Sequence, residues 1–350
     1  MKKNMKMKVP LVLALCLIII SLASSCAGSN KTTLYVYNWG DYIDQEVIER
    51  FEKEYDIKVV YDTYATNEDM YVKLKSGGSN YDVIFPSDYM IERLIKEDML
   101  HKINFDNVPN YKYIEDRFKN LPYDPNNEYS VPYMWGTLGI VYNVNMVDEP
   151  VDSWSILWDE KYKNQILMLD SQRDSIGVAL KMLGYSLNST NPDELEEAKN
   201  ALIEQKPLVL SYVGDDVKDK MVAEEAALAV VFSGEAVAIK YENPNHEFVV
   251  PKEGGNLWFD AMAIPKTSKN KEAAELFINF MCDPEIAFLN ADYLKYSSPH
   301  SEVKKMIDEE LANDETAYPP DEILENCEVF KDLGENLKLY DRVWTEVKAK

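Results

Sequence analysis

The chain has 350 residues, of which 46% are hydrophobic, so it is long enough for one large or two medium domains with a substantial core. Its formal net charge of −24 disfavours nucleic acid as a partner, because the phosphate backbone would be repelled. With only three histidines, a histidine-based metal or catalytic centre is not indicated. We expect neither a metal nor a cofactor.

The N-terminus has the pattern of a targeting segment. Four lysines precede an apolar run from Val9 to Leu22, which is short for a membrane span. Small residues then lead to Cys26, as in a lipoprotein signal peptide over residues 1–25. We expect lipid on Cys26 and a tether over residues 26–32, with a secretory signal cut elsewhere or an uncleaved anchor as alternatives. The chain would then lie on the outer face of the cytoplasmic membrane or in the periplasmic space.

Residues 33–97 alternate predicted strands and helices, which favours an α/β fold with a parallel sheet. In such sheets ligands bind beyond the carboxyl ends of the strands. Two strand ends carry an acid beside aromatic residues, Trp39-Gly40-Asp41-Tyr42 and Ser87-Asp88-Tyr89. The predicted elements are, in order, Thr33 to Asn38, Val47 to Tyr55, Ile57 to Tyr61, Asn67 to Leu74, Tyr81 to Pro86 and Ile91 to Glu97.

After an irregular stretch from Asn104 to Tyr129, two extended runs indicate a crossing into a second lobe, which alternates again. The runs are Val131 to Gly136 and Leu138 to Asn143. The later predicted strands are Ile166 to Leu169, Leu208 to Leu210, Ala227 to Phe232 and His246 to Val250. The later predicted helices are Ser175 to Leu183, Pro192 to Glu204, Ser233 to Tyr241, Lys271 to Met281, Pro284 to Tyr293, Glu302 to Leu311 and Gly334 to Ala349.

The stretch from Asn256 to Pro265 is predicted to be a buried strand that carries one carboxylate. Trp258 and Asp260 share a face of this strand. A buried, unpaired carboxylate costs several kcal/mol, and no Lys or Arg lies between Glu253 and Pro265. Asp260 therefore requires a cation from elsewhere, and the local sequence leaves open whether this is a core arginine or a bound ammonium group.

An acid beside an aromatic residue recurs at the predicted strand ends, at Phe232 and Glu235 as well as at the sites above. Carboxylates bind N–H donors, and aromatic faces attract ammonium groups and pack against methylenes. The pattern fits a linear alkyl diamine or triamine. Asp41 and Asp88 could instead cap helices, the tryptophans could belong to the core, and acid pairs of a glycoside hydrolase remain open.

Several longer motifs resemble the spermidine/putrescine-binding protein family of polyamine ABC transporters from about Thr33 to the C-terminus. They are Tyr37-Asn38-Trp39-Gly40-Asp41-Tyr42, Pro86-Ser87-Asp88-Tyr89, Tyr133-Met134-Trp135-Gly136, Lys181-Met182-Leu183-Gly184-Tyr185-Ser186 and Pro251 through Pro265.

The resemblance implies a type 2 periplasmic-binding-protein fold with a ligand cleft between two α/β lobes. It implies a first lobe of residues 31–136 plus 259–301 and a second lobe of residues 137–258 plus 302–350. The protein would be a monomeric, non-enzymatic binding component that docks on an ABC permease and its ATPase. The ligand residues carried over are Trp39, Asp41, Tyr42, Ser87, Tyr89, Asp174, Trp258, Asp260 and Tyr296.

Three positions depart from the spermidine-selective pattern. Phe232 replaces a tryptophan, Phe330 replaces a glutamine, and Asp174 replaces a glutamate that is one methylene longer. Glu235 stands where putrescine-selective relatives carry an acid. We therefore add Asp88, Phe232 and Glu235 to the candidate site and leave the choice between putrescine and spermidine open. A receptor for another small solute on the same fold is the alternative. We expect Cys282 and Cys327 to be unpaired.

Overall fold

The computed structural model describes residues 32–77 and 80–350. The predicted signal peptide, Cys26 and almost all of the predicted tether lie outside these residues. Within the described part of the chain, no helix is both long and apolar enough to cross a membrane.

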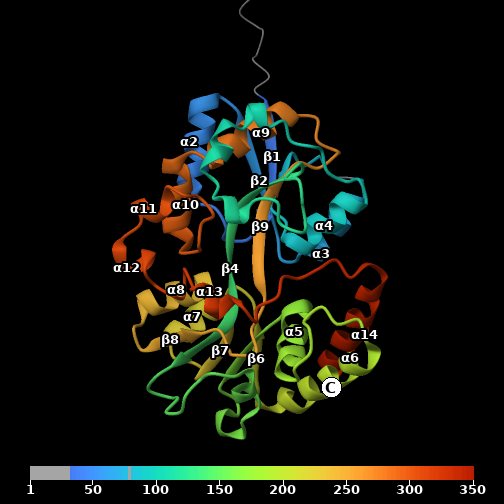
Figure 1. Cartoon of the computed structure of the whole chain (residues 1–350), viewed down its shortest axis with the longest axis vertical. Coiled ribbons are helices and arrows are strands. Elements are labelled where there is room, and N and C mark those ends of the chain that lie inside the picture. Colours follow the sequence, from blue (N-terminus) through green and yellow to red (C-terminus); the bar gives the residue numbers. More distant parts are fainter. Residues whose placement is uncertain (1–31, 78–79) are drawn as a thin grey trace, which may run out of the picture.

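Two long strands at the centre of the molecule join two halves of one sheet (Figure 1). The strand order is β2-β1-β3-β9-β4-β7-β5-β6, and β8 also pairs with β4. The pairs that β1 forms with β2 and β3 are parallel, as are those of β5 with β6 and β7. The central strands β4 and β9 run antiparallel to each other and to their other neighbours. The described strands are β1 (Thr33–Trp39), β2 (Lys58–Tyr64), β3 (Val83–Ile84), β4 (Ser130–Asn143), β5 (Ile166–Leu169), β6 (Val209–Val213), β7 (Leu228–Phe232), β8 (His246–Val249) and β9 (Leu257–Ala263).

The helices cover the two halves of the sheet, which are the two lobes of an α/β fold (Figure 1). Local sequence explains where they begin: Asp44 caps α2 by accepting a hydrogen bond from Glu46, and Asn191 with Pro192 starts α6. The α-helices are α2 (Gln45–Tyr55), α3 (Asn67–Lys75), α4 (Asp88–Lys96), α5 (Gln172–Met182), α6 (Pro192–Gln205), α7 (Val217–Val222), α8 (Ser233–Glu242), α9 (Lys271–Met281), α10 (Pro284–Leu294), α11 (Val303–Met306), α12 (Glu309–Ala312), α13 (Asp321–Leu324) and α14 (Leu337–Ala349).

Some predicted elements differ from the structure. The two extended runs before residue 144 form one continuous strand, β4, because it pairs with β9 as far as Thr137 and with β7 from Leu138 onward. The predicted strand from Tyr81 to Pro86 shortens to two residues, and the predicted helix from Glu302 to Leu311 divides into α11 and α12. The helices α7 and α13 were not predicted.

The C-terminal region contacts both lobes. Val303, Ile307, Leu311 and Ala317 belong to the same buried cluster as β1 and β3 of the first lobe. Tyr340, Val343 and Val347 of α14 pack with α5 and α6 of the second lobe. Residues 303–317 also bond to the second lobe, because Lys240 of α8 forms an ion pair with Asp314, 3.1 Å away, and donates to Thr316 at 2.9 Å. The segment therefore lies between the lobes.

Candidate functional site

Asp260 lies on β9 at the centre of the molecule, where β9 pairs with β4 and forms a bridge to Ser87. The residue is only 5% exposed, so its carboxylate is largely removed from water. Burial raises the pKa of Asp260 to about 7, and the nearby Ser87 and Tyr42 side chains oppose this shift only in part. Asp260 is thus a costly charge at neutral pH unless a cation reaches it.

Several buried polar atoms around Asp260 have no hydrogen-bond partner among the described residues. They include Oδ1 of Asp260, the hydroxyl of Tyr42 and Nε1 of Trp258. Tyr42 and Ser87 lie close enough to Asp260 to lower its pKa, but they make no hydrogen bond of normal geometry with it. Native proteins satisfy most buried polar groups, so such a cluster requires an explanation. Neither a lysine nor an arginine forms an ion pair with Asp260 within 32–77 and 80–350. The core-arginine alternative for Asp260 therefore finds no support in the described contacts.

Aromatic rings line the same region. The ring of Trp258 is perpendicular to that of Tyr296 at 5.4 Å and to that of Phe232 at 5.9 Å. Tyr42 contacts Tyr296 edge-on at 5.7 Å. Four of the predicted site residues thus form one aromatic wall, which can contact an alkyl chain and attract ammonium groups.

Two glycines allow this wall to form. A Cβ at Gly136 would lie 2.7 Å from the Trp258 ring, and one at Gly234 would lie 2.3 Å from the Tyr296 ring. Any larger residue at these positions would displace the rings.

Glu235 supplies a second acid beside the wall. It lies in the first turn of α8, and its Oε2 atom is buried without a partner among the described residues. The pKa of Glu235 is raised to about 7, mainly by burial; the hydrogen bond with Tyr296 opposes this shift and the nearby Asp215 adds to it. Glu235 and Asp260 therefore share one environment, in which two carboxylates lack a counter-charge.

Asp215 is a site candidate that the sequence interpretation missed. It follows β6 in the second lobe, and its Oδ2 atom lies 3.0 Å from where a Cβ at Gly40 of the first lobe would stand. The residue is exposed, and no hydrogen bond or ion pair is found for it within the described chain. Tyr212 precedes it by three residues at the end of β6, the same spacing as Phe232 and Glu235, so the pattern of acid beside aromatic residue could have revealed it.

Ser87, Asp88 and Tyr89 begin α4 but have different surroundings. The carboxylate of Asp88 accepts hydrogen bonds from the backbone of Phe259 at 3.0 Å and of Tyr89 at 2.6 Å, so it joins α4 to β9. Burial raises the pKa of Asp88 well above its usual value. The Tyr89 hydroxyl donates to Glu68, 3.1 Å away. The Asp88 carboxylate therefore already accepts hydrogen bonds from two backbone N–H groups, whereas Ser87 lies next to Asp260.

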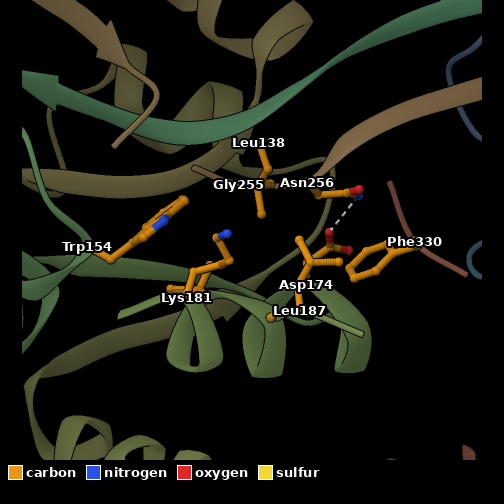
Figure 2. Close-up of a pocket in the computed structure, with 10 residues that line it drawn as sticks. Leu138, Trp154, Asp174, Lys181, Leu187, Gly255, Asn256 and Phe330 are labelled. Carbon is orange, nitrogen blue, oxygen red and sulfur yellow. Dashed lines mark hydrogen bonds between the residues drawn. The ribbon is translucent and has the colours of Figure 1, made fainter. Parts of the chain in front are cut away.

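Asp174 lies at the start of α5, in a small pocket with Asn256 and Phe330 (Figure 2). It accepts a hydrogen bond from Ser171 at 2.6 Å and one from Asn256 at 3.4 Å. Burial raises its pKa. Oδ1 of Asn256 has no partner among the residues that the structure describes. Asp174 is therefore better satisfied than Asp260, and the space next to it is narrow.

The neighbouring Arg173 is buried among rings rather than paired with an acid. Its guanidinium lies 5.1 Å from the Tyr89 ring and 4.3 Å from the Phe330 ring, and it donates to the Lys331 carbonyl at 3.3 Å. Its Nε atom is buried without a hydrogen-bond partner among the described residues.

Trp39 and Asp41 lie farther toward the surface. The indole of Trp39 donates to the Phe85 carbonyl at 2.9 Å, and its ring contacts Tyr64 at 4.7 Å. Asp41 is exposed and accepts a hydrogen bond from the Tyr293 hydroxyl at 2.7 Å. These two predicted ligand residues are therefore not gathered around Asp260 as closely as the aromatic wall is.

Metal or disulfide chemistry finds no support in the described part of the chain. No group of three or more His, Cys, Asp or Glu residues there could hold a metal ion. Cys282 and Cys327 are free, as the sequence predicted.

Comparison with known proteins extends these findings. A model of the family described as bacterial extracellular solute-binding protein matches residues 46–319. The chain belongs to this family. It is 38% identical over 328 residues to the spermidine/putrescine-binding periplasmic protein of Escherichia coli, covering 93% of this chain and 94% of the relative.

Solved structures agree with this assignment. The spermidine/putrescine ABC transporter substrate-binding protein of Streptococcus pneumoniae has a TM-score of 0.78 and 42% identity, covering 91% of this chain and 99% of that one. A lipoprotein of Treponema pallidum has a TM-score of 0.82 and 30% identity, covering 91% and 100%. The predicted periplasmic-binding-protein fold is confirmed. The chain is an extracytoplasmic solute-binding component and not an enzyme, so the hydrolase alternative is wrong.

The raised pKa of Asp260 makes the stability of the ligand-free protein depend on pH. The folded protein holds this proton up to about pH 7, whereas the unfolded chain loses it near pH ~4. The free energy of unfolding therefore falls as pH rises through this window, by about 1.4 kcal/mol per unit of pKa difference. We predict that Asp260→Asn unfolds at a higher urea concentration than the wild type at pH 8 and shows a shallower decline between pH 4 and pH 7.

Urea titrations at several pH values measure this effect. Asp88, Asp174 and Glu235 also have raised pKa values and leave some pH dependence in the variant. Equal slopes for the two proteins would show that Asp260 already has a counter-charge in the ligand-free protein.

Proposed function

We propose that this protein captures polyamines, putrescine or spermidine, for an ABC importer. The observation that carries the proposal is the unpartnered, buried Oδ1 atom of Asp260 beside an aromatic wall. An ammonium group would supply the missing donor and the missing charge together. A neutral sugar would supply donors but leave the charge unbalanced.

In the proposed complex, Asp260 binds one ammonium group, with the Ser87 hydroxyl and Tyr42 beside it. The rings of Phe232, Trp258 and Tyr296 contact the alkyl chain, and Glu235 receives a second ammonium group. Trp39, Asp41, Asp88, Tyr89 and Asp174 complete the predicted set around these central residues. The polyamine names of the relatives support the same ligand class.

Ligand entry requires the lobes to separate. Asp260 is 5% exposed, and Tyr42 and Trp258 are each 6% exposed, so the described arrangement encloses the site. β4 and β9 connect the lobes, and we propose that bending of these strands opens an interlobe cleft. Closure would then remove water from the ammonium–carboxylate contacts and strengthen them.

The same proposal includes a lipid anchor at Cys26 and docking of a monomer on a permease and its ATPase. The N-terminal sequence supports the anchor, as does the similarity to a lipoprotein of Treponema pallidum. The similarity to an ABC transporter component supports the partners. The anchor would be the only contact with the membrane.

Calorimetric titration tests the ligand class directly. We expect putrescine, cadaverine, spermidine or spermine to bind the wild type and amino acids not to bind. Asp260→Asn should weaken binding by about 2–5 kcal/mol, because the ligand charge would lose its buried partner.

Asp82→Asn is the matched control. Asp82 is 1% exposed but is bonded to Ser268, Asn270 and the backbone of Tyr35, so its loss should lower stability and leave affinity unchanged. Absence of binding by all four amines would refute the proposal.

Substitution of Asp215 tests whether the protein binds a second ammonium group of the ligand. Asp215→Asn should weaken putrescine binding by roughly threefold to tenfold at low salt, because the variant removes a charge near Glu235. Butylamine, which has one ammonium group at Asp260, should bind with unchanged affinity.

Asp216→Asn controls for surface charge, since Asp216 is adjacent but bonds to the backbone of Gly214 and lies 3.7 Å from Lys220. An equal loss for both amines, or for both variants, would argue against a role for Asp215 in binding the second ammonium group.

A further inference from the structure

The pairing of β4 with β9 contains an irregularity directly opposite Asp260. Pro132 pairs with Ala261, and Met134 pairs with Asp260, so Tyr133 is an extra residue in β4. Proline has no backbone N–H, which makes it compatible with an interrupted ladder. A bulge of this kind redirects the side chain that it carries and bends the strand.

The redirected side chain of Tyr133 contacts the loop between β1 and α2. Its hydroxyl donates a hydrogen bond to the backbone carbonyl of Tyr42 at 2.8 Å. Its ring is perpendicular to the Tyr42 ring at 5.4 Å and to the Phe85 ring at 4.9 Å. Tyr133 is 6% exposed, so these contacts are shielded from water.

Tyr42 has few other restraints on its position. Its carbonyl also accepts a longer hydrogen bond, 3.4 Å, from the Asn38 amide. Its own hydroxyl is buried beside the Asp260 carboxylate but makes no hydrogen bond of normal geometry among the described residues. The Tyr42 side chain is therefore held in the site mainly by hydrogen bonds to its backbone carbonyl and by contacts of its ring. Tyr133 makes one contact of each kind.

We propose that Tyr133 is a positioning residue, which uses the β4 bulge to hold Tyr42 against the ligand position beside Asp260. This inference rests on the proposed function, because Tyr42 acts there on the bound ammonium group. Through the bulge, β4, which crosses between the lobes, contacts the loop that carries Tyr42. Tyr133 itself does not contact the ligand.

The test uses Tyr133→Phe, which removes only the hydroxyl. We expect putrescine affinity to fall about threefold to tenfold, as for the loss of one buried hydrogen bond. Tyr340→Phe is the matched control: Tyr340 is fully buried in the second lobe, and its hydroxyl also donates to a backbone carbonyl, that of Ser189, at 2.8 Å. The control should lose stability and keep its affinity.

A double-mutant cycle distinguishes positioning from a general structural effect. If Tyr133 acts through the Tyr42 hydroxyl, Tyr133→Phe should have little effect on affinity in a Tyr42→Phe background. An undiminished loss in that background, or an equal loss in Tyr340→Phe, would overturn the inference.

A readout without ligand separates this inference from the proposed function. In protein labelled with 3-fluorotyrosine, the ¹⁹F resonance of Tyr42, assigned with Tyr42→Phe, should shift or broaden in Tyr133→Phe and not in Tyr340→Phe. An unchanged Tyr42 resonance would contradict positioning by Tyr133, whichever solute binds. If the wild type bound no polyamine but the Tyr42 resonance still shifted in Tyr133→Phe, the proposed ligand class would be refuted. The positioning of Tyr42 by Tyr133 would remain supported.

Discussion

The buried carboxylate of Asp260 is the constraint on which the site depends. Burial on a central strand makes its ionised form unfavourable, and the described residues provide no cation to offset this cost. Nearby, Glu235 repeats the same situation. In the proposed function, two unpaired acids next to four aromatic rings form a site that a cationic ligand completes. Under this proposal the ligand-free protein would give up stability that binding restores.

The fold determines where this cost is located. β4 and β9 cross between the lobes (Figure 1). Asp260 lies on β9, while Glu235 lies in the first turn of α8 and Asp215 follows β6 in the second lobe. Lobe separation would expose these acids to water, and closure would bring them to the same ligand. Binding and closure are coupled in this account because the same contacts contribute to both.

Local sequence was sufficient to predict part of this architecture. Alternating strands and helices indicated the two lobes, and the single acid on an otherwise apolar strand pointed to Asp260. The β4 bulge at Tyr133, the approach of Asp215 to Gly40 and the ring-covered Arg173 were not predictable in this way. Each depends on the register or packing of segments distant in sequence, which residue patterns do not specify.

A crystal structure of the protein with putrescine or spermidine tests the central claim most directly. The account predicts continuous density for a linear amine between the lobes, with one ammonium nitrogen within about 3 Å of Oδ1 of Asp260. It also predicts that the rings of Trp258 and Tyr296 contact the alkyl chain. A lysine or arginine side chain bonded to Asp260 in that crystal, with the amine elsewhere or absent, would contradict the account.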